Sequence, residues 1–188
     1  VQAGGTAMWL TTTRAQAREV AGRLSALLGP AGFRVIASTR DDRTGDVDIL
    51  SGRADVVVTV YEKARALLLR SPALRRAARL VVADAVHVLE DGDRGPAVGL
   101  LFALWLAGPS APQVIALTSS PAAGRAAAAA LGIALHEDTT RPEPLRLGDL
   151  DSATGVVRWN DPESRASGSL DLGTWSAEAP LDGLRRAV

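Results

Sequence analysis

Apolar runs of strand length alternate with segments of helical periodicity along most of the chain. The runs lie at Ala7–Thr11, Phe33–Ser38, Ala54–Val60, between Arg79 and Asp84, and at Gln113–Thr118. Amphipathic or alanine-rich segments follow most of them. Strands that alternate regularly with helices predict a mostly parallel sheet covered on both faces, with right-handed crossovers. The predicted fold class is therefore α/β.

Several predicted helices have recognisable ends. Thr13 with Gln16, and Thr59 with Glu62, have the spacing of a capping box, in which side chains satisfy free amides of the first turn. We expect the first helix to stop near Gly29. Its apolar side consists of Val20, Leu24, Leu27 and Leu28.

Two later helices should begin at prolines. A helix over Pro96–Ala107 follows the polar turn Asp91–Gly95, and proline suits the first helical turn. Ser120 is placed as an N-cap before Pro121, and the alanine-rich segment that follows should be helical to Leu131.

The stretch Arg79–Pro96 carries the most specific chemistry. Its apolar run has the length of a strand buried on both faces, and it places Asp84 at the carboxyl end, where open α/β sheets bind ligands. In nucleotide hydrolases such an Asp holds Mg²⁺, and a neighbouring acid positions the attacking water. Here that neighbour is Ala85. The sequence thus contains the acid that would hold the metal ion but not the acid that would position the attacking water.

Hydroxyl-bearing residues mark three helix starts that should share the carboxyl edge of the sheet. They lie in Thr12–Arg14, Thr59–Lys63 and Thr118–Ser120. Free amides at such helix starts suit phosphate binding. Capping alone explains each one, but three of them beside Asp84 favour a phosphate-bearing ligand.

Acidic residues crowd the polar segment Thr39–Asp48. Its acids are Asp41, Asp42, Asp46 and Asp48. Their spacing lacks the glycine and the distal glutamate of a calcium loop. We therefore expect a solvated loop.

Composition narrows the functional classes. The 188 residues are 47% apolar and carry no net charge, so any nucleic-acid binding must come from local patches. The absence of cysteine excludes thiolate metal sites and indicates the cytoplasm. The longest apolar stretch, Ala97–Ala107, is shorter than the about 20 residues that a bilayer requires. Because the chain begins at Val1 and its only methionine is Met8, we expect it to be a piece of a longer protein.

The pattern changes after Arg141. Leu145–Leu147, Gly155–Trp159 and Ser169–Leu172 predict short antiparallel strands. We assign residues 1–144 to the α/β domain, 145–176 to a β-strand appendage or linker, and 177–188, from about Pro180, to the start of a further helix. The tryptophans should serve core or appendage packing: Trp9, Trp105, Trp159 and Trp175.

Five motifs, in this order, resemble those of the first RecA-like domain of superfamily 2 helicases, closest to the Ski-like group that includes archaeal repair helicases. They are Leu10–Ala15 for Pro-Thr-Arg-Ala, Thr59–Lys63 for Thr-x-Glu-Lys, Asp84–His87 with Asp93–Pro96 for the DExH box and its Arg-Gly-Pro tail, Ala116–Ser120 for Ser-Ala-Thr, and Arg141–Leu145 for the exit segment. The resemblance implies a RecA-like three-layer sandwich of the P-loop NTPase type, with the C-terminal β-hairpin as an appendage.

The resemblance also implies roles for individual residues. One single DNA or RNA strand would face Thr13, Arg14, Thr59, Glu62 and Lys63. Asp84 would face Mg²⁺–ATP, provided that a phosphate loop exists upstream of Val1. His87 belongs to the box, while Thr118, Ser119 and Ser120 occupy the motif that links hydrolysis to strand separation. The expected partner is a second RecA-like domain or another protein subunit.

A local basic run supports strand binding, although a solvated helix face is an equally weighted explanation. It consists of Lys63, the only lysine of the chain, with Arg65, Arg70, Arg75, Arg76 and Arg79. Contacts of such residues to phosphates give affinity without sequence specificity.

Three departures from the family pattern bear on activity. The 188 residues contain no Gly-x-x-x-x-Gly-Lys-Ser/Thr loop, which the resemblance places just upstream of Val1. Ala85 removes a base that is typically worth about 10²–10⁴-fold in rate. The Ser-Ala-Thr position reads Thr-Ser-Ser, and the second RecA-like domain, which supplies the arginine finger, would begin only near Pro180.

Three interpretations follow. The leading one is a degenerate, catalytically impaired helicase-like lobe that binds nucleic acid or acts as a protein scaffold within a larger protein or assembly. The alternative is an excised lobe of an active ATP-dependent helicase, against which Ala85 argues. An unrelated α/β enzyme or nucleotide binder is the third, although the chain lacks the Gly-x-Gly-x-x-Gly of a dinucleotide site.

Overall fold

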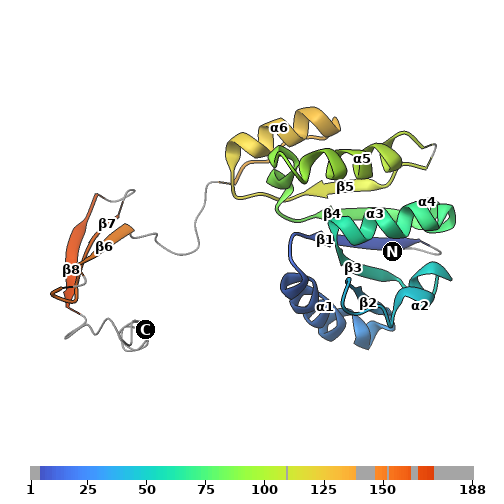
Figure 1. The fold of residues 1–188 in the computed structure, drawn as a ribbon, viewed down its shortest axis with the longest axis horizontal. Coiled ribbons are helices and arrows are strands. Elements are labelled where there is room, and N and C mark those ends of the chain that lie inside the picture. The colour runs from blue at the N-terminus through green and yellow to red at the C-terminus, as the bar shows by residue number, and fades with distance from the viewer. Residues whose placement is uncertain (1–4, 109, 139–146, 152, 162–164, 172–188) are drawn as a thin grey trace. The chain divides into compact units, whose positions relative to one another are not determined.

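The computed structural model describes residues 5–108, 110–138, 147–151, 153–161 and 165–171. The chain divides into two compact units, Val1–Glu137 and Asp138–Val188 (Figure 1). In the part that the structure describes, no helix is long and apolar enough to cross a membrane.

A parallel sheet of five strands forms the centre of the first unit, in the order β2-β3-β1-β4-β5 (Figure 1). The strands are β1 (Thr6–Thr11), β2 (Val35–Ser38), β3 (Val56–Val60), β4 (Ala78–Ala83) and β5 (Gln113–Ala116). The helices are α1 (Arg14–Leu28), α2 (Asp46–Leu50), α3 (Tyr61–Arg70), α4 (Pro72–Ala77), α5 (Gly95–Leu106) and α6 (Pro121–Leu131), with the 3₁₀ turns η1 (Gly29–Ala31) and η2 (Val86–Glu90).

Side chains of the central strand β1 alternate between two apolar cores. Met8 and Leu10 are fully buried in the larger core, which α3 and α5 complete on one face of the sheet. Ala7 and Trp9 belong to the smaller core under α1 on the other face. Because successive strand residues point to opposite faces, this alternation produces three layers. The predicted α/β sandwich is confirmed.

Helix α1 confirms its predicted ends but not all of its predicted apolar side. The Thr13 hydroxyl accepts from the Gln16 amide at 3.2 Å, the Gln16 side chain accepts from the Thr13 amide at 3.2 Å, and the helix ends at Gly29. The prediction for Leu27 is wrong, since it is 72% exposed. Ala17 is buried instead, because the side that meets the sheet is centred on small residues.

The capping box predicted at Thr59 and Glu62 is wrong. Helix α3 has Val60 as its N-cap, and no side chain caps it. The buried Thr59 hydroxyl donates to the Ser38 carbonyl at 2.6 Å, across the β2–β3 pairing. Strand pairing thus occupies the hydroxyl that capping would have required.

The segment Thr39–Asp48 is not simply a solvated loop. Helix α2 begins within it at Asp46, whose side chain is only 13% exposed, and the buried Ile49 anchors this helix in the larger core. The acids predicted to face solvent therefore include one that is almost buried.

The second unit contains an antiparallel sheet of three strands, β6 (Leu147–Asp151), β7 (Val156–Asn160) and β8 (Ser167–Asp171). Of the predicted strand Leu145–Leu147, the structure describes Leu147, which lies in β6. Trp159 pairs with Gly148 on one side and Gly168 on the other, and a Cβ at Gly168 would lie 2.6 Å from the indole. The glycines therefore make room for the ring. The predictions for residues 145–146, Leu172, Trp175 and the helix from Pro180 fall outside the described residues.

Candidate nucleic-acid interface

The predicted box, Asp84–His87, follows directly on the end of β4. The Asp84 amide donates to the Leu10 carbonyl at 2.9 Å, and the Asp84 carbonyl accepts from the Tyr61 hydroxyl at 2.8 Å. Burial raises the pKa of Tyr61, and the nearby Asp84 charge adds to the effect, so the phenol remains a donor at neutral pH. The backbone of the box is thereby tied to β1 and to α3.

Ala85 turns the chain sharply out of the sheet. Its φ of 56° and ψ of 48° lie in the left-handed region, which residues other than glycine seldom adopt. The next amide, that of Val86, donates to the Leu117 carbonyl at 2.9 Å. Hydrogen bonds of the amides on both sides of Ala85 therefore hold this strained turn in place.

The structure brings His87 close to Thr118, the first residue of the predicted Ser-Ala-Thr position. A ring nitrogen of His87 lies 3.4 Å from the Thr118 hydroxyl, and His87 is exposed. Ser120 caps α6 by accepting from the Ala123 amide at 3.3 Å, as predicted, while Ser119 is exposed. Among the described residues, no group of three or more His, Asp or Glu could hold a metal ion. Asp84 would therefore need ligands from the nucleotide and water to hold Mg²⁺.

Arg94, from the Arg-Gly-Pro tail, joins two other motifs. Its guanidinium lies 2.7 Å from the Glu62 carboxylate and donates to the Thr12 carbonyl at 3.2 Å. The Asp91 carboxylate accepts from the Asp93 and Arg94 amides at 2.9 Å each, and these hydrogen bonds lower the pKa of Asp91. Segments far apart in sequence thus meet at one edge of the sheet.

The residues predicted to face a strand differ in accessibility. Thr13 and Glu62 are exposed, and Arg14 is half exposed in an ion pair with Asp41. Thr59 is fully buried, so its side chain is the least accessible of the five, and its contact with a strand stays a prediction. Lys63 is only 12% exposed, and its ammonium lies 2.6 Å from the Asp46 carboxylate.

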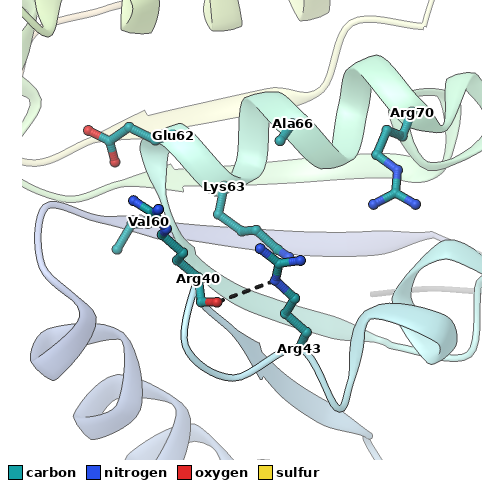
Figure 2. A pocket seen from close by; sticks show the side chains of 7 residues that line it. All are labelled: Arg40, Arg43, Val60, Glu62, Lys63, Ala66 and Arg70. Carbon is teal, nitrogen blue, oxygen red and sulfur yellow. Dashed lines mark hydrogen bonds between the residues drawn. The ribbon is translucent and has the colours of Figure 1, made fainter.

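Beside this edge, the loop between β2 and α2 and the outer side of α3 enclose a hollow of about 290 Å³ (Figure 2). Its walls are Arg40, Arg43, Val60, Glu62, Lys63, Ala66 and Arg70. The sequence does not single out Arg40 and Arg43, because they alternate with the acids Asp41, Asp42 and Asp46 in a segment without periodicity. Lys63 and Arg70 are seven residues apart, two helical turns, and this spacing was a usable signal.

The sheet order, the layers and the gathered strand-end motifs define the RecA-like fold of superfamily 2 helicases. No protein-family model matches the chain. The chain is 32% identical over 146 residues to the ATP-dependent DNA helicase Hel308 of Aeropyrum pernix, covering 77% of this chain and 19% of that protein. Hel308 of Caldivirga maquilingensis is 33% identical over 141 residues, with 74% and 18% covered.

Solved helicase structures share the fold. The helicase MrfA bound to DNA matches with a TM-score of 0.57 and 14% identity, over 70% of this chain and 19% of that one. The Mycobacterium smegmatis helicase Lhr bound to ssDNA and AMP-PNP matches with a TM-score of 0.50 and 22% identity, over 62% and 17%. The chain is a partial homologue of the Hel308 superfamily 2 DNA helicases, and it spans less than a fifth of the length of these relatives.

Proposed function

We propose that the chain is a degenerate helicase-like lobe that binds one nucleic-acid strand at the carboxyl edge of its parallel sheet and is impaired in ATP hydrolysis. The observation that carries the proposal is the Arg94 bridge, which holds Glu62 and the Thr12 carbonyl together at that edge. The bridge keeps a binding surface assembled, whereas the hydrolytic position beside Asp84 is an alanine.

Impairment follows from the side chain at position 85. A methyl group neither accepts a proton from water nor orients it, so the contribution of about 10²–10⁴-fold from a base is lost. No Gly-x-x-x-x-Gly-Lys-Ser/Thr sequence lies within the 188 residues to bind the β- and γ-phosphates. Mg²⁺–ATP would be held at Asp84 only with groups from elsewhere.

Strand binding follows from the accessible groups at the same edge. Thr13, Arg14 and Glu62 are exposed enough to meet a strand, and the arginine-lined hollow adds positive charge beside them. Because the whole chain carries no net charge, this local concentration of arginine is what would attract a polyanion. Such contacts predict little sequence preference.

A lobe of this kind would act inside a larger protein or assembly in the cytoplasm. We propose residues 1–144 as the lobe, with 145–176 as an appendage or linker and 177–188 as the start of a further helix. A second RecA-like domain or another subunit would complete it, and the lobe would then also serve as a scaffold.

The test is a pair of assays on the full chain. Fluorescence anisotropy with a single-stranded oligonucleotide should show binding that weakens as salt rises, while strand-stimulated ATP hydrolysis stays at background. Asp84→Asn should leave both unchanged. Hydrolysis that the strand stimulates and that Asp84→Asn abolishes would instead support an excised lobe of an active helicase.

A further inference from the structure

The hollow beside α3 concentrates cationic side chains. Arg40 and Arg43 come from the β2–α2 loop and Arg70 from the end of α3, and all three are exposed (Figure 2). In the described part of the chain, no carboxylate lies within ion-pair distance of these three side chains. The Arg43 side chain donates to the Arg40 carbonyl at 3.3 Å, which orders the loop. Three like charges around one space favour an anion between them.

Lys63 lines the same hollow but its charge is already neutralised. Its ammonium lies 2.6 Å from one Asp46 oxygen, and the Ser38 hydroxyl donates to the other at 2.5 Å. Both charged side chains of this pair are nearly buried, at 12% and 13% exposure. The pair therefore fastens the start of α2, and with it the loop that carries Arg43, to α3.

The acid that lines the hollow, Glu62, is also paired. The Glu62 carboxylate is paired with Arg94 and, in Figure 2, points away from Lys63. Val60 and Ala66 supply apolar surface between the charged groups. A volume of about 290 Å³ lies near the lower end of small-ligand pockets, about 300–1,000 Å³. The hollow thus has room for about one nucleotide unit.

We propose that this hollow binds an internal phosphodiester group of a single strand, with Arg40, Arg43 and Arg70 as its ligands and Lys63 as a positioning residue. Planar guanidinium groups donate in pairs to phosphate oxygens, which suits them to this role. The inference rests on the proposed strand binding and assigns its phosphate contacts to residues outside the helicase-like motifs.

The experiment measures anisotropy of the full chain with a fluorescent oligothymidylate that lacks terminal phosphates, between 50 and 200 mM salt. Each phosphate contact to a single strand contributes about 0.7 to the slope of log affinity against log salt. Replacing Arg40, Arg43 and Arg70 together by glutamine should reduce the slope by about 0.7, the contribution of one phosphate, which is about 2.6-fold less loss of affinity over this fourfold range of salt. Each single replacement should produce part of that reduction. Arg23→Gln, on α1 and paired with Glu19, is the matched control and should change nothing.

The double variant Asp46→Asn with Lys63→Met tests whether Lys63 binds the phosphate itself or only positions the arginines. It removes one charge of each sign, so the local net charge is unchanged. If the arginines are the ligands, the slope stays at the wild-type value. A slope reduced by about 0.7 in the double variant, with normal slopes in the arginine variants, would make Lys63 the ligand and overturn the proposal.

Two further outcomes are distinguishable. Salt-dependent binding by the wild type that no arginine variant alters would refute the hollow while leaving the proposed function standing, whereas no binding at all would refute both. Inorganic phosphate is the second probe. The hollow should discriminate against it, so thermal protection by millimolar phosphate that equals protection by the oligomer would point to a free anion as ligand and contradict the assignment to a strand.

Discussion

Replacing Ala85 by glycine should stabilise the chain, although Ala→Gly usually destabilises. At φ 56° and ψ 48°, an L-residue bears a steric penalty of about 1–2 kcal/mol, which glycine escapes. Glycine adds freedom to the unfolded chain, which costs about 0.4–1 kcal/mol. Ala85 is partly exposed, so loss of its methyl group has a small effect. The expected net gain is about 0.5–1 kcal/mol.

Urea and thermal unfolding, followed by far-UV circular dichroism, measure this gain. For a chain of this size, 1 kcal/mol corresponds to about 2–4 °C in the melting temperature. Ala126→Gly is the matched control. Ala126 is exposed inside α6, so this substitution removes the same methyl group from a residue with a helical backbone. The control should lose about 1 kcal/mol.

If Ala85→Gly and Ala126→Gly lower the free energy of unfolding by the same amount, the predicted gain at Ala85 is refuted. That outcome would mean that Ala85 does not hold a left-handed conformation in solution, and the box would then have a different backbone from the one described. Opposite signs would support a strained, left-handed turn at Ala85.

Three further predictions concern groups that hold the edge together. Tyr61→Phe should lower the free energy of unfolding by about 1–2 kcal/mol in urea titration, because the Asp84 carbonyl loses its donor. The free energy of unfolding should fall above about pH 10, since burial raises the pKa of Tyr61 and the unfolded chain therefore releases the phenolic proton at lower pH. Melting temperatures from pH 8 to 11 measure this fall. Tyr61→Phe should make the melting temperature less dependent on pH in this range. Lys63→Met should lower the free energy of unfolding by about 2–4 kcal/mol, because it leaves the nearly buried Asp46 carboxylate unpaired. Adding Asp46→Asn should recover most of this loss. Equal melting temperatures for the single and double variants would contradict this prediction.

Periodicity was sufficient to predict the sheet and most helix ends. The apolar runs correspond to β1 through β5, and local signals such as Thr13 with Gln16 form the predicted caps. These features depend on interactions between residues close in sequence, or on burial that every buried strand shares. The resemblance to superfamily 2 helicases, carried by short motifs in order, is confirmed by the Hel308 relatives.

The failures all depend on contacts between distant segments. Thr59 has the spacing of a cap, but its hydroxyl is taken by Ser38 on the neighbouring strand. Asp46 resembles a solvent-facing acid until α3 brings Lys63 against it. The hollow likewise needs the β2–α2 loop and α3 to be placed together, which no spacing in the sequence specifies. The role of each proposed strand contact remains a prediction.

The most direct test of strand binding is the slope of log affinity against log salt for the full chain and a single-stranded oligonucleotide. The proposed interface predicts affinity that falls as salt rises, and a slope that decreases by about 0.7 when Arg40, Arg43 and Arg70 are all replaced by glutamine. Wild-type binding that is absent, or whose affinity does not change with salt, would contradict it.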